Sequence, residues 1–266
     1  MAKRRLGQNF LRDTAVIARI IESLDLTPQD IVVEIGCGTG SLTRGLMGKV
    51  SQFIGVELDT ALCQRLKNEY SSENTLFLNQ DILGLDVEAL LRSLHVDSRK
   101  AKVVGNLPYY ISSPIVEWLG RQTAVIHSAT VMFQSEVAYR LLAAPGNKEY
   151  GVLTLLAEYH FFSKWLLDVK PGAFRPIPKV HSTLIKLIPK VERLLDARVE
   201  PAFFRFLKQS FSQRRKTLRN SLKGTVESDR LHSVLSLLGH RLDSRAEVLS
   251  LEDFVVLFKQ LSDSSV

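Results

Sequence analysis

The stretch GNLPYYISSP (105–114) places an asparagine, a proline and two tyrosines directly after an apolar, strand-like run. A plain turn favours Gly, Asn, Asp or Pro and has no need for two consecutive large aromatics. The Asn106 side-chain oxygen and the Leu107 carbonyl can accept hydrogen bonds from an exocyclic amine, which localises the lone pair of its nitrogen. Pro108 lacks an N–H donor and biases Leu107 to an extended shape. With Tyr109 stacked on the ring, the stretch predicts a clamp for a nucleobase amine; the alternative is a rigid turn with buried tyrosines.

A second candidate site is the glycine loop EIGCGTG (34–40). Gly36, Gly38 and Gly40 follow a strand-like run and precede a helix expected near Ser41, and glycines let the backbone approach a ligand closely. A dinucleotide fingerprint, G-x-G-x-x-G, would have glycine where Ser41 stands. The spacing G-x-G-x-G instead suits the methionine part and ribose of S-adenosylmethionine (AdoMet), which has no phosphate. A glycine loop alone is weak evidence, because such turns also occur without ligands.

Acids after the next two strand-like runs strengthen the cofactor reading. Glu57 ends the run QFIGVE and can accept hydrogen bonds from both ribose hydroxyls, whereas the neighbouring Asp59 suits a helix N-cap. Asp81 follows the third run and suits the adenine amino group, with a solvated loop acid as the alternative. Cys37 inside the loop is expected to be a small filler rather than a nucleophile.

These residues need a scaffold that brings strand ends together. Strand-length apolar runs alternate with amphipathic stretches, which favours an α/β, Rossmann-like fold: a parallel sheet with helices on both faces. The carboxyl ends of such strands form the crevice where ligands bind. The predicted strands are 31–36, 52–57, 75–80, 102–106, 129–133 and 182–188, and two clear helices are 59–70 and 87–94.

A domain boundary is expected at about 190–197, where Pro189 and a charged stretch follow the last predicted strand. We therefore predict a catalytic, AdoMet-binding domain over 1–192 and a small helical, RNA-binding domain over 193–266. Within the second domain, 203–223 has seven Lys/Arg and no acid. Considered as one helix, it places its apolar residues on one side and its cations on another. The apolar side comprises Phe203, Leu207, Phe211, Leu218 and Leu222, and the cationic side Lys208, Arg215, Arg219 and Lys223.

Composition fits a globular protein that binds a polyanion. Hydrophobic content of 45% and charged content of 24% are ordinary, and no apolar run reaches the ~18 residues of a membrane span. The start has no apolar core of a secretory signal. The two cysteines form no disulfide or metal pattern, and the six histidines are scattered. A net charge of +7, concentrated at 1–12 and 203–223, favours nucleic acid; a solubilising face is the alternative.

Together these motifs resemble the KsgA/RsmA family, the bacterial small-subunit (16S) ribosomal RNA adenine-N6,N6-dimethyltransferases. The resemblance covers nearly the whole chain, and it is carried by LGQNFL (6–11), EIGCGTG (34–40), VELD (56–59), GNLPYYIS (105–112), AFRPIPKVHS (173–182) and FSQRRKTLRNSL (211–222). The erythromycin-resistance methylases and mitochondrial transcription-factor relatives share several of these motifs, and the last one favours the housekeeping ribosomal branch.

The resemblance implies a role for each matching residue. Phe174 would close the target adenine's other face, opposite Tyr109; the alternative for Phe174 is a core residue. The cofactor would contact Asn9, Leu11, Gly36, Gly38, Glu57, Asp81 and Asn106. The catalytic residues would be Asn106, Leu107, Pro108, Tyr109 and Phe174. RNA would bind Arg214, Arg215, Lys216, Arg219 and Lys223.

The implied activity is methyl transfer from AdoMet to N6 of two adjacent adenines in a hairpin loop near the 3′ end of 16S rRNA. Each transfer would leave S-adenosyl-L-homocysteine, and the partner would be the assembling 30S subunit. We expect a cytoplasmic monomer that uses no metal and no membrane. Three rivals are an RNA-binding assembly factor without activity, a nicotinamide oxidoreductase, disfavoured by Ser41, and a resistance methylase acting on large-subunit RNA.

Overall fold

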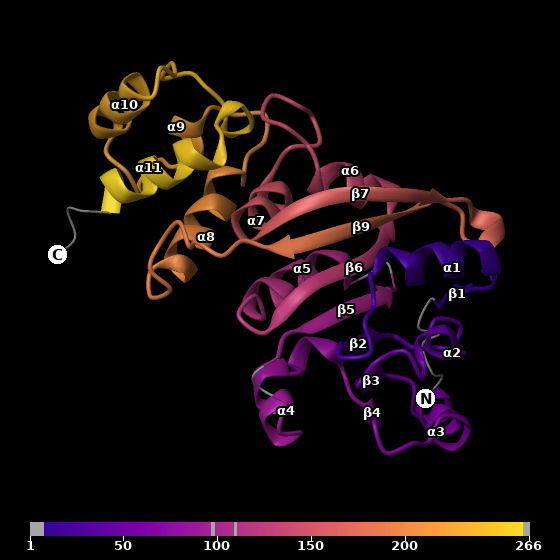
Figure 1. Cartoon of the computed structure of the whole chain (residues 1–266). Coiled ribbons are helices and arrows are strands. Elements are labelled where there is room, and N and C mark those ends of the chain that lie inside the picture. The colour runs from indigo at the N-terminus through magenta and orange to yellow at the C-terminus, as the bar shows by residue number, and fades with distance from the viewer. Residues whose placement is uncertain (1–7, 97–98, 109–110, 263–266) are drawn as a thin grey trace, which may run out of the picture. The chain divides into compact units, whose positions relative to one another are not determined.

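A mixed seven-stranded sheet forms the centre of the computed structural model, which describes residues 8–96, 99–108 and 111–262 (Figure 1). The strand order is β4-β3-β2-β5-β6-β9-β7, and the pairs from β4 to β6 are parallel. The strands are β2 (Ile31–Ile35), β3 (Gln52–Glu57), β4 (Thr75–Asn79), β5 (Ala101–Asn106), β6 (Ile126–Gln134), β7 (Phe161–Val169) and β9 (Ser182–Pro189).

The prediction of a Rossmann-like sheet is confirmed. The expectation that all strands of the sheet are parallel was wrong. β9 pairs antiparallel with both β6 and β7. The reason is the short connection from β7 to β9, which contains no crossover helix and so returns the chain in the opposite direction. β7 itself was not predicted, and the predicted run 129–133 is only the middle of β6.

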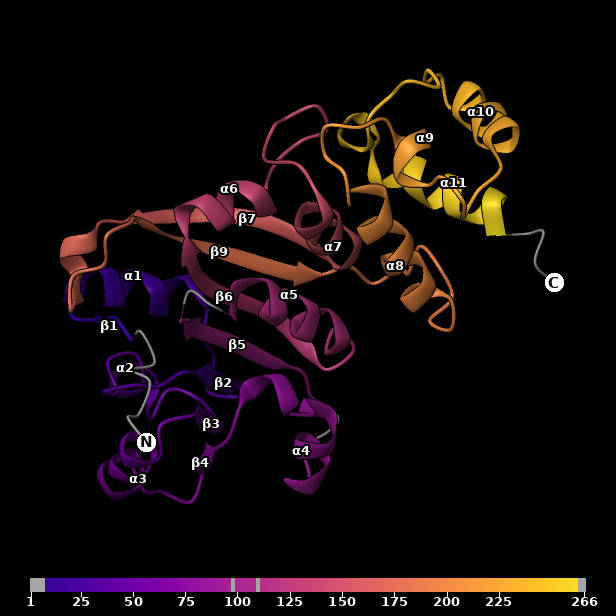
Figure 2. The ribbon, with the colours of Figure 1, turned by 180° about the vertical axis from the view of Figure 1, so that it is seen from behind.

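Helices cover both faces of this sheet (Figures 1 and 2). On one face, residues of α1 to α3 pack with Val32, Phe53 and Val104 into one buried cluster. The neighbouring residues Val33 and Val103 of these strands are also fully buried, and α4 and α5 lie on the other face of the sheet (Figure 2). The bounds are α1 (Thr14–Ser23), α2 (Thr43–Leu46), α3 (Thr60–Glu69), α4 (Val87–Ser93) and α5 (Ser112–Arg121). Thus the predicted helices 59–70 and 87–94 are α3 and α4.

A two-stranded sheet lies apart from the large one. β1 (Phe10–Leu11) pairs antiparallel with β8 (Phe174–Arg175), and the backbone N–H of Arg12 donates to the Ala173 carbonyl. No hydrophobic pattern in the sequence predicted either strand, because two residues are too few to show a period. This pairing fixes the N-terminal segment beside the loop that precedes β9.

The chain divides into two compact units, Met1–Ala138 with Phe161–Pro189 and Tyr139–His160 with Lys190–Val266. The C-terminal part of the second unit starts at Lys190, close to the predicted boundary, and the unit also takes in Tyr139–His160 from the middle of the chain. Its buried cluster includes Tyr150, whose hydroxyl donates to the Leu249 carbonyl at 2.9 Å. Its helices are α7 (Val152–His160), α8 (Glu200–Ser210), α9 (Leu218–Ser221), α10 (Ser228–Leu237) and α11 (Leu251–Ser262), and α6 (Ser135–Leu141) leads into it.

The prediction of one continuous helix over 203–223 was wrong. α8 ends at Ser210, turns follow, and Thr217 caps the short α9 by accepting from the Asn220 N–H. The intervening residues 212–217 are all polar, so they offer no apolar stripe to hold a helix against a core. The predicted apolar side is nevertheless inside: Phe203, Leu207, Leu218 and Leu222 are buried and Phe211 is half-buried.

Candidate active site

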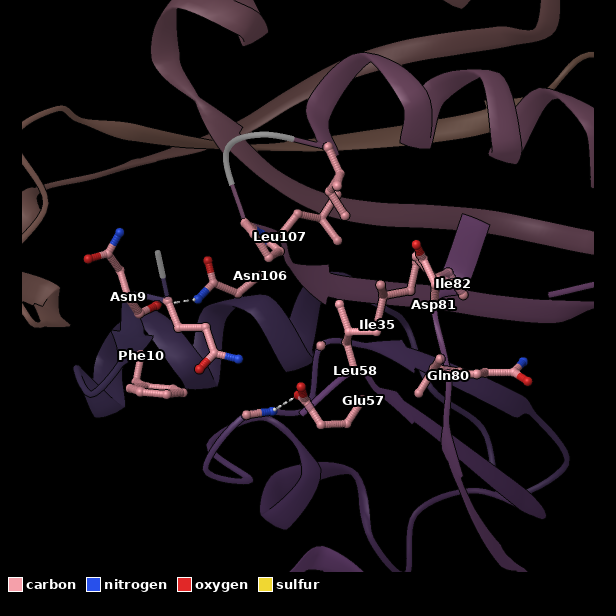
Figure 3. Close-up of a pocket in the computed structure, with 16 residues that line it drawn as sticks. Asn9, Phe10, Ile35, Glu57, Leu58, Gln80, Asp81, Ile82, Asn106 and Leu107 are labelled. Carbon is pink, nitrogen blue, oxygen red and sulfur yellow. Dashed lines mark hydrogen bonds between the residues drawn. The ribbon is translucent and has the colours of Figure 1, made fainter. Parts of the chain in front are cut away.

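A pocket opens at the carboxyl ends of β2, β3 and β5, where the sequence predicted the crevice (Figure 3). Its empty volume is about 790 Å³, which includes space open to solvent. The structure brings together most of the predicted site residues here. They are Asn9, Gly36, Gly38, Glu57, Asp81, Asn106, Leu107 and Pro108.

The glycine loop approaches this pocket in a conformation that disfavours side chains. Gly36, Gly38 and Gly40 have φ of +70°, +56° and +79°, in the left-handed region. At Gly38 the space is also tight, because a Cβ would lie 3.0 Å from the Phe10 ring. The loop can therefore present bare backbone to a ligand, as the spacing predicted.

Glu57 joins the end of β3 to the glycine loop. Its Oε2 accepts from the Gly38 N–H at 2.8 Å and its Oε1 accepts from the Asp59 N–H at 2.9 Å, and the residue is 3% exposed. A carboxylate has about four lone-pair sites, so two stay available for ligand hydroxyls. Asp59 caps α3 by accepting from two backbone N–H groups, as the sequence indicated.

Asp81 is partly committed to local structure. Its Oδ1 accepts from the Leu83 N–H at 3.0 Å and so caps the 3-10 turn Ile82–Gly84. It also lines the pocket. Because the cap uses one of the two carboxylate oxygens, the contact with an adenine amino group stays a prediction.

The charge of the pocket argues against a phosphate-bearing cofactor. Among the described residues that line it, Glu57 and Asp81 are acidic and none is Lys or Arg. Below the loop, Glu34 is 1% exposed and accepts from the Thr43 hydroxyl at 2.6 Å. Burial, with the nearby Glu57 charge, raises the pKa of Glu34 to about 7. Such a site suits a cationic ligand, and the AdoMet sulfonium is one.

Glu34 was quoted in the glycine motif but received no role from the sequence. An acid inside the otherwise apolar run IVVEI was the available signal, since an acid is rarely buried without a partner. It lines a smaller cavity that shares Gly36, Gly38 and Asn106 with the pocket. Cys37 lines this cavity as well, and burial raises the pKa of its thiol well above the usual value, which agrees with a filler role.

The segment Gln8–Leu11, here called the strap, is tied to both predicted loops. The Asn106 Nδ2 donates to the Asn9 carbonyl at 3.0 Å, and the Ser41 hydroxyl donates to the Leu11 carbonyl at 2.7 Å. Figure 3 shows the Asn106 amide nitrogen facing the strap while its oxygen points away from it. The strap therefore engages the amide nitrogen and leaves the amide oxygen directed away from the strap.

Leu11 lies at the end of the strap. Its side chain is 2% exposed in the core and lines the smaller cavity. Its carbonyl accepts from the Ser41 hydroxyl, a group that received no role from the sequence. The contact of Leu11 with the cofactor stays a prediction.

Ser41→Ala is expected to lower AdoMet affinity about 3- to 10-fold, because one partly buried hydrogen bond between strap and glycine loop is lost. Turnover at saturating AdoMet should change less than affinity. Calorimetry with AdoMet measures this, and Ser41→Thr, which keeps the hydroxyl, should recover affinity. Equal affinities for wild type and Ser41→Ala would show that this hydrogen bond does not hold the cofactor site.

Comparisons with known proteins decide the family. A family model described as ribosomal RNA adenine dimethylase matches residues 1–263. This chain belongs to that family. It is 38% identical over 262 residues to the ribosomal RNA small subunit methyltransferase A of Dechloromonas aromatica, covering 98% of each chain. The protein of the same name from Pseudomonas putida is 38% identical, with 98% of this chain and 96% of the relative covered.

Two solved structures share the adenine dimethylase fold over almost the full length. A dimethyladenosine transferase from Plasmodium falciparum superposes with a TM-score of 0.77 at 25% identity, covering 97% of this chain and 98% of that one. The 23S rRNA methyltransferase ErmE superposes with a TM-score of 0.70 at 28% identity, covering 96% and 100%. Membership of this family excludes the nicotinamide oxidoreductase considered above.

The remaining predicted residues are placed as follows. Phe174 is 1% exposed in the core beside the strap, so stacking on an adenine would require its ring to leave this position. Tyr109 lies outside the described residues. All five predicted RNA-binding residues, Arg214, Arg215, Lys216, Arg219 and Lys223, are exposed in the second unit.

In the described ranges, no group of three or more His, Cys, Asp or Glu could hold a metal ion. None of the helices there is long and apolar enough to cross a membrane.

Proposed function

We propose that this chain transfers methyl groups from AdoMet to N6 of adenines in small-subunit ribosomal RNA. The observation that carries the proposal is the arrangement of Asn106. Its amide ends β5 at the rim of an acidic, glycine-lined pocket, and its nitrogen is engaged by the Asn9 carbonyl. The oxygen is thereby left to accept from a target amine.

The proposed reaction requires the chain mainly to align the target amine with the methyl group of AdoMet. An adenine amine is a poor nucleophile because its lone pair is delocalised into the ring. Acceptors at the Asn106 oxygen and the Leu107 carbonyl favour pyramidal nitrogen, with the lone pair aimed at the methyl group. The sulfonium is an excellent leaving group, so positioning suffices without a strong base. Bound AdoMet supplies the methyl group, and Glu57 with the glycine loop would hold it.

The proposed target is a pair of adjacent adenines in a hairpin loop near the 3′ end of 16S rRNA, which receive two methyl groups each. The proposed setting is the assembling 30S subunit in the cytoplasm, with the enzyme acting as a monomer. The curated relatives support the small subunit by name. The similarity to ErmE supports the rival, a large-subunit target, at lower identity.

The test is incubation with labelled AdoMet and either unmethylated small subunits or unmethylated large subunits, followed by mapping of modified bases. We expect label as N6,N6-dimethyladenosine at two adjacent positions in the small subunit. Label in the large subunit alone would favour the rival reading, and label in neither would contradict the proposed activity.

For the second unit we propose RNA binding through Arg214, Arg215, Lys216, Arg219 and Lys223. The exposed cations follow α8 and surround α9, and the stretch has no acid. Because 203–223 is not one helix, the support comes from this exposure and charge and not from helical spacing. Phosphate is the partner that such a surface suits.

Arg215→Ala with Arg219→Ala is expected to weaken small-subunit binding and to flatten its salt dependence by about one unit of slope per lost phosphate contact. AdoMet affinity should not change. The measurement is subunit binding from low to moderate salt, and the control is Arg230→Ala with Lys259→Ala, an equal charge change on α10 and α11. If plots of log affinity against log salt concentration have the same slope and intercept for wild type and for the Arg215→Ala, Arg219→Ala variant, this surface does not contact RNA.

A further inference from the structure

One wall of the pocket is formed by two segments that leave neighbouring parallel strands. Glu57 ends β3 and Leu58 follows it, while the segment 80–82 follows β4, and all of these residues line the pocket (Figure 3). The last register pair of the two strands is Glu57 with Asn79. Beyond this pair the ladder of the sheet ends, so other contacts have to hold the two segments together.

The Asn79 side chain supplies such contacts. Its Nδ2 donates to the Glu57 carbonyl at 2.9 Å and to the Leu58 carbonyl at 3.1 Å, so both donors of the amide nitrogen are used. Its Oδ1 accepts from the Thr60 hydroxyl at 2.9 Å, which keeps the nitrogen turned toward the two carbonyls. Asn79 thus cross-links the two segments, although it is not among the described residues that line the pocket.

The cross-link fixes the backbone of two residues that face the pocket. Leu58 is 44% exposed and lines the pocket, so it offers an apolar surface to a ligand. The Glu57 carboxylate is held separately by the N–H groups of Gly38 and Asp59. Because hydrogen bonds to both carbonyls limit rotation of the peptide between Glu57 and Leu58, they help to determine where these two side chains point.

We propose that Asn79 is a positioning residue for the nucleoside half of AdoMet. This inference rests on the proposed function, which takes AdoMet as the methyl donor. Glu57 is the predicted acceptor for the ribose hydroxyls and Asp81 for the adenine amino group. A bound nucleoside would therefore span the two segments that Asn79 joins. The methionine half is expected at the glycine loop, so the loss of Asn79 should act on the nucleoside half.

The test is calorimetry on the full-length Asn79→Leu variant, which replaces the amide by a side chain of similar size without donors. The ligands are AdoMet and 5′-methylthioadenosine, which has the nucleoside but not the amino-acid part. Both affinities should fall by the same factor, about 5- to 10-fold, because two hydrogen bonds are lost. In methylation assays the loss should appear in the KM for AdoMet and not in kcat.

Thr60→Val provides a second, milder variant. It removes only the hydrogen bond to Asn79 Oδ1 and leaves the donors of the amide in place, so both ligands should bind about 2-fold more weakly. Thr60→Ser keeps the hydroxyl and should restore wild-type affinity.

Asn74→Leu is the matched control at the other end of the same strand. Asn74 precedes β4, its Nδ2 donates to the Val50 carbonyl at 3.2 Å and its Oδ1 accepts from the Ser72 hydroxyl at 2.9 Å. This variant loses hydrogen bonds of the same kinds away from the pocket. Its affinities for AdoMet and 5′-methylthioadenosine should equal those of wild type.

Three results would overturn the inference. One is a folded Asn79→Leu variant that binds both ligands like wild type. Another is an equal loss of affinity in Asn74→Leu, which would assign the effect to β4 as a whole. The third is weaker binding of AdoMet with unchanged binding of 5′-methylthioadenosine. Ligand binding decides this inference and labelling of RNA decides the proposed function, so the failure of one is distinguishable from the failure of the other.

Discussion

Asn106→Ala is expected to reduce methyl transfer at saturating AdoMet by about 100- to 1,000-fold, the usual effect of losing one preorganised hydrogen-bonding group that acts in the transition state. The oxygen that would accept from the target amine is removed. The bond from Nδ2 to the Asn9 carbonyl is lost as well, so some AdoMet affinity should be lost with it. Folding and RNA binding should persist.

The measurement is single-turnover methylation of small subunits at saturating AdoMet. Ser41→Ala is the comparison, because it removes the other strap hydrogen bond and leaves the Asn106 oxygen in place. If Asn106 acts only by anchoring the strap, the two variants should lose similar activity. Turnover near the wild-type value for Asn106→Ala would refute the acceptor role.

Glu57→Ala should weaken AdoMet binding by about 1–3 kcal/mol, since a charged acceptor for two ribose hydroxyls is lost. The structure adds a second reason for a large effect. The same carboxylate accepts a hydrogen bond from the Gly38 N–H and so orders the glycine loop. Glu57→Gln should lose less affinity, because the amide retains one acceptor oxygen.

Calorimetry with AdoMet on folded protein tests this assignment. Glu88→Ala, on an exposed part of α4, is the matched control and should bind AdoMet like wild type. An AdoMet affinity equal to wild type in a folded Glu57→Ala variant would show that Glu57 does not bind the ribose hydroxyls. An equal loss in Glu57→Gln would instead assign the effect to the charge of the carboxylate.

Local patterns in the sequence predicted much of the first unit. The run QFIGVE (52–57) is β3 with the same bounds, because a strand buried on both faces reads as a continuous apolar run. Glu57 and Asn106 could be placed at one crevice since parallel strands bring their carboxyl ends to the same edge of a sheet. The glycine spacing predicted a loop whose backbone can approach a ligand closely, and Gly36, Gly38 and Gly40 adopt left-handed conformations in that loop.

Predictions that depended on which neighbours a residue meets were less complete. The stretch 203–223 alternated apolar and basic residues well enough to suggest one helix, yet its polar middle has no core to pack against and forms turns. Phe174 reads equally as a stacking ring or a core residue, and in the structure its ring is in the core. Such alternatives differ in burial, which a local pattern does not contain.

By itself the sequence determined the α/β scaffold, the glycine loop, the acid at the end of β3 and the asparagine at the end of β5, because each follows from a local period or a strand end. Only the tertiary structure decided how the site is held together. The Asn106–Asn9 hydrogen bond joins residues 97 apart in the chain, and the Ser41–Leu11 bond joins residues 30 apart. Contacts over such separations depend on the sheet and β8, which place the strap, since closing each loop has an entropic cost that no local segment repays. Glu34 gains its raised pKa in the same way, from the helices and the glycine loop that exclude water around it.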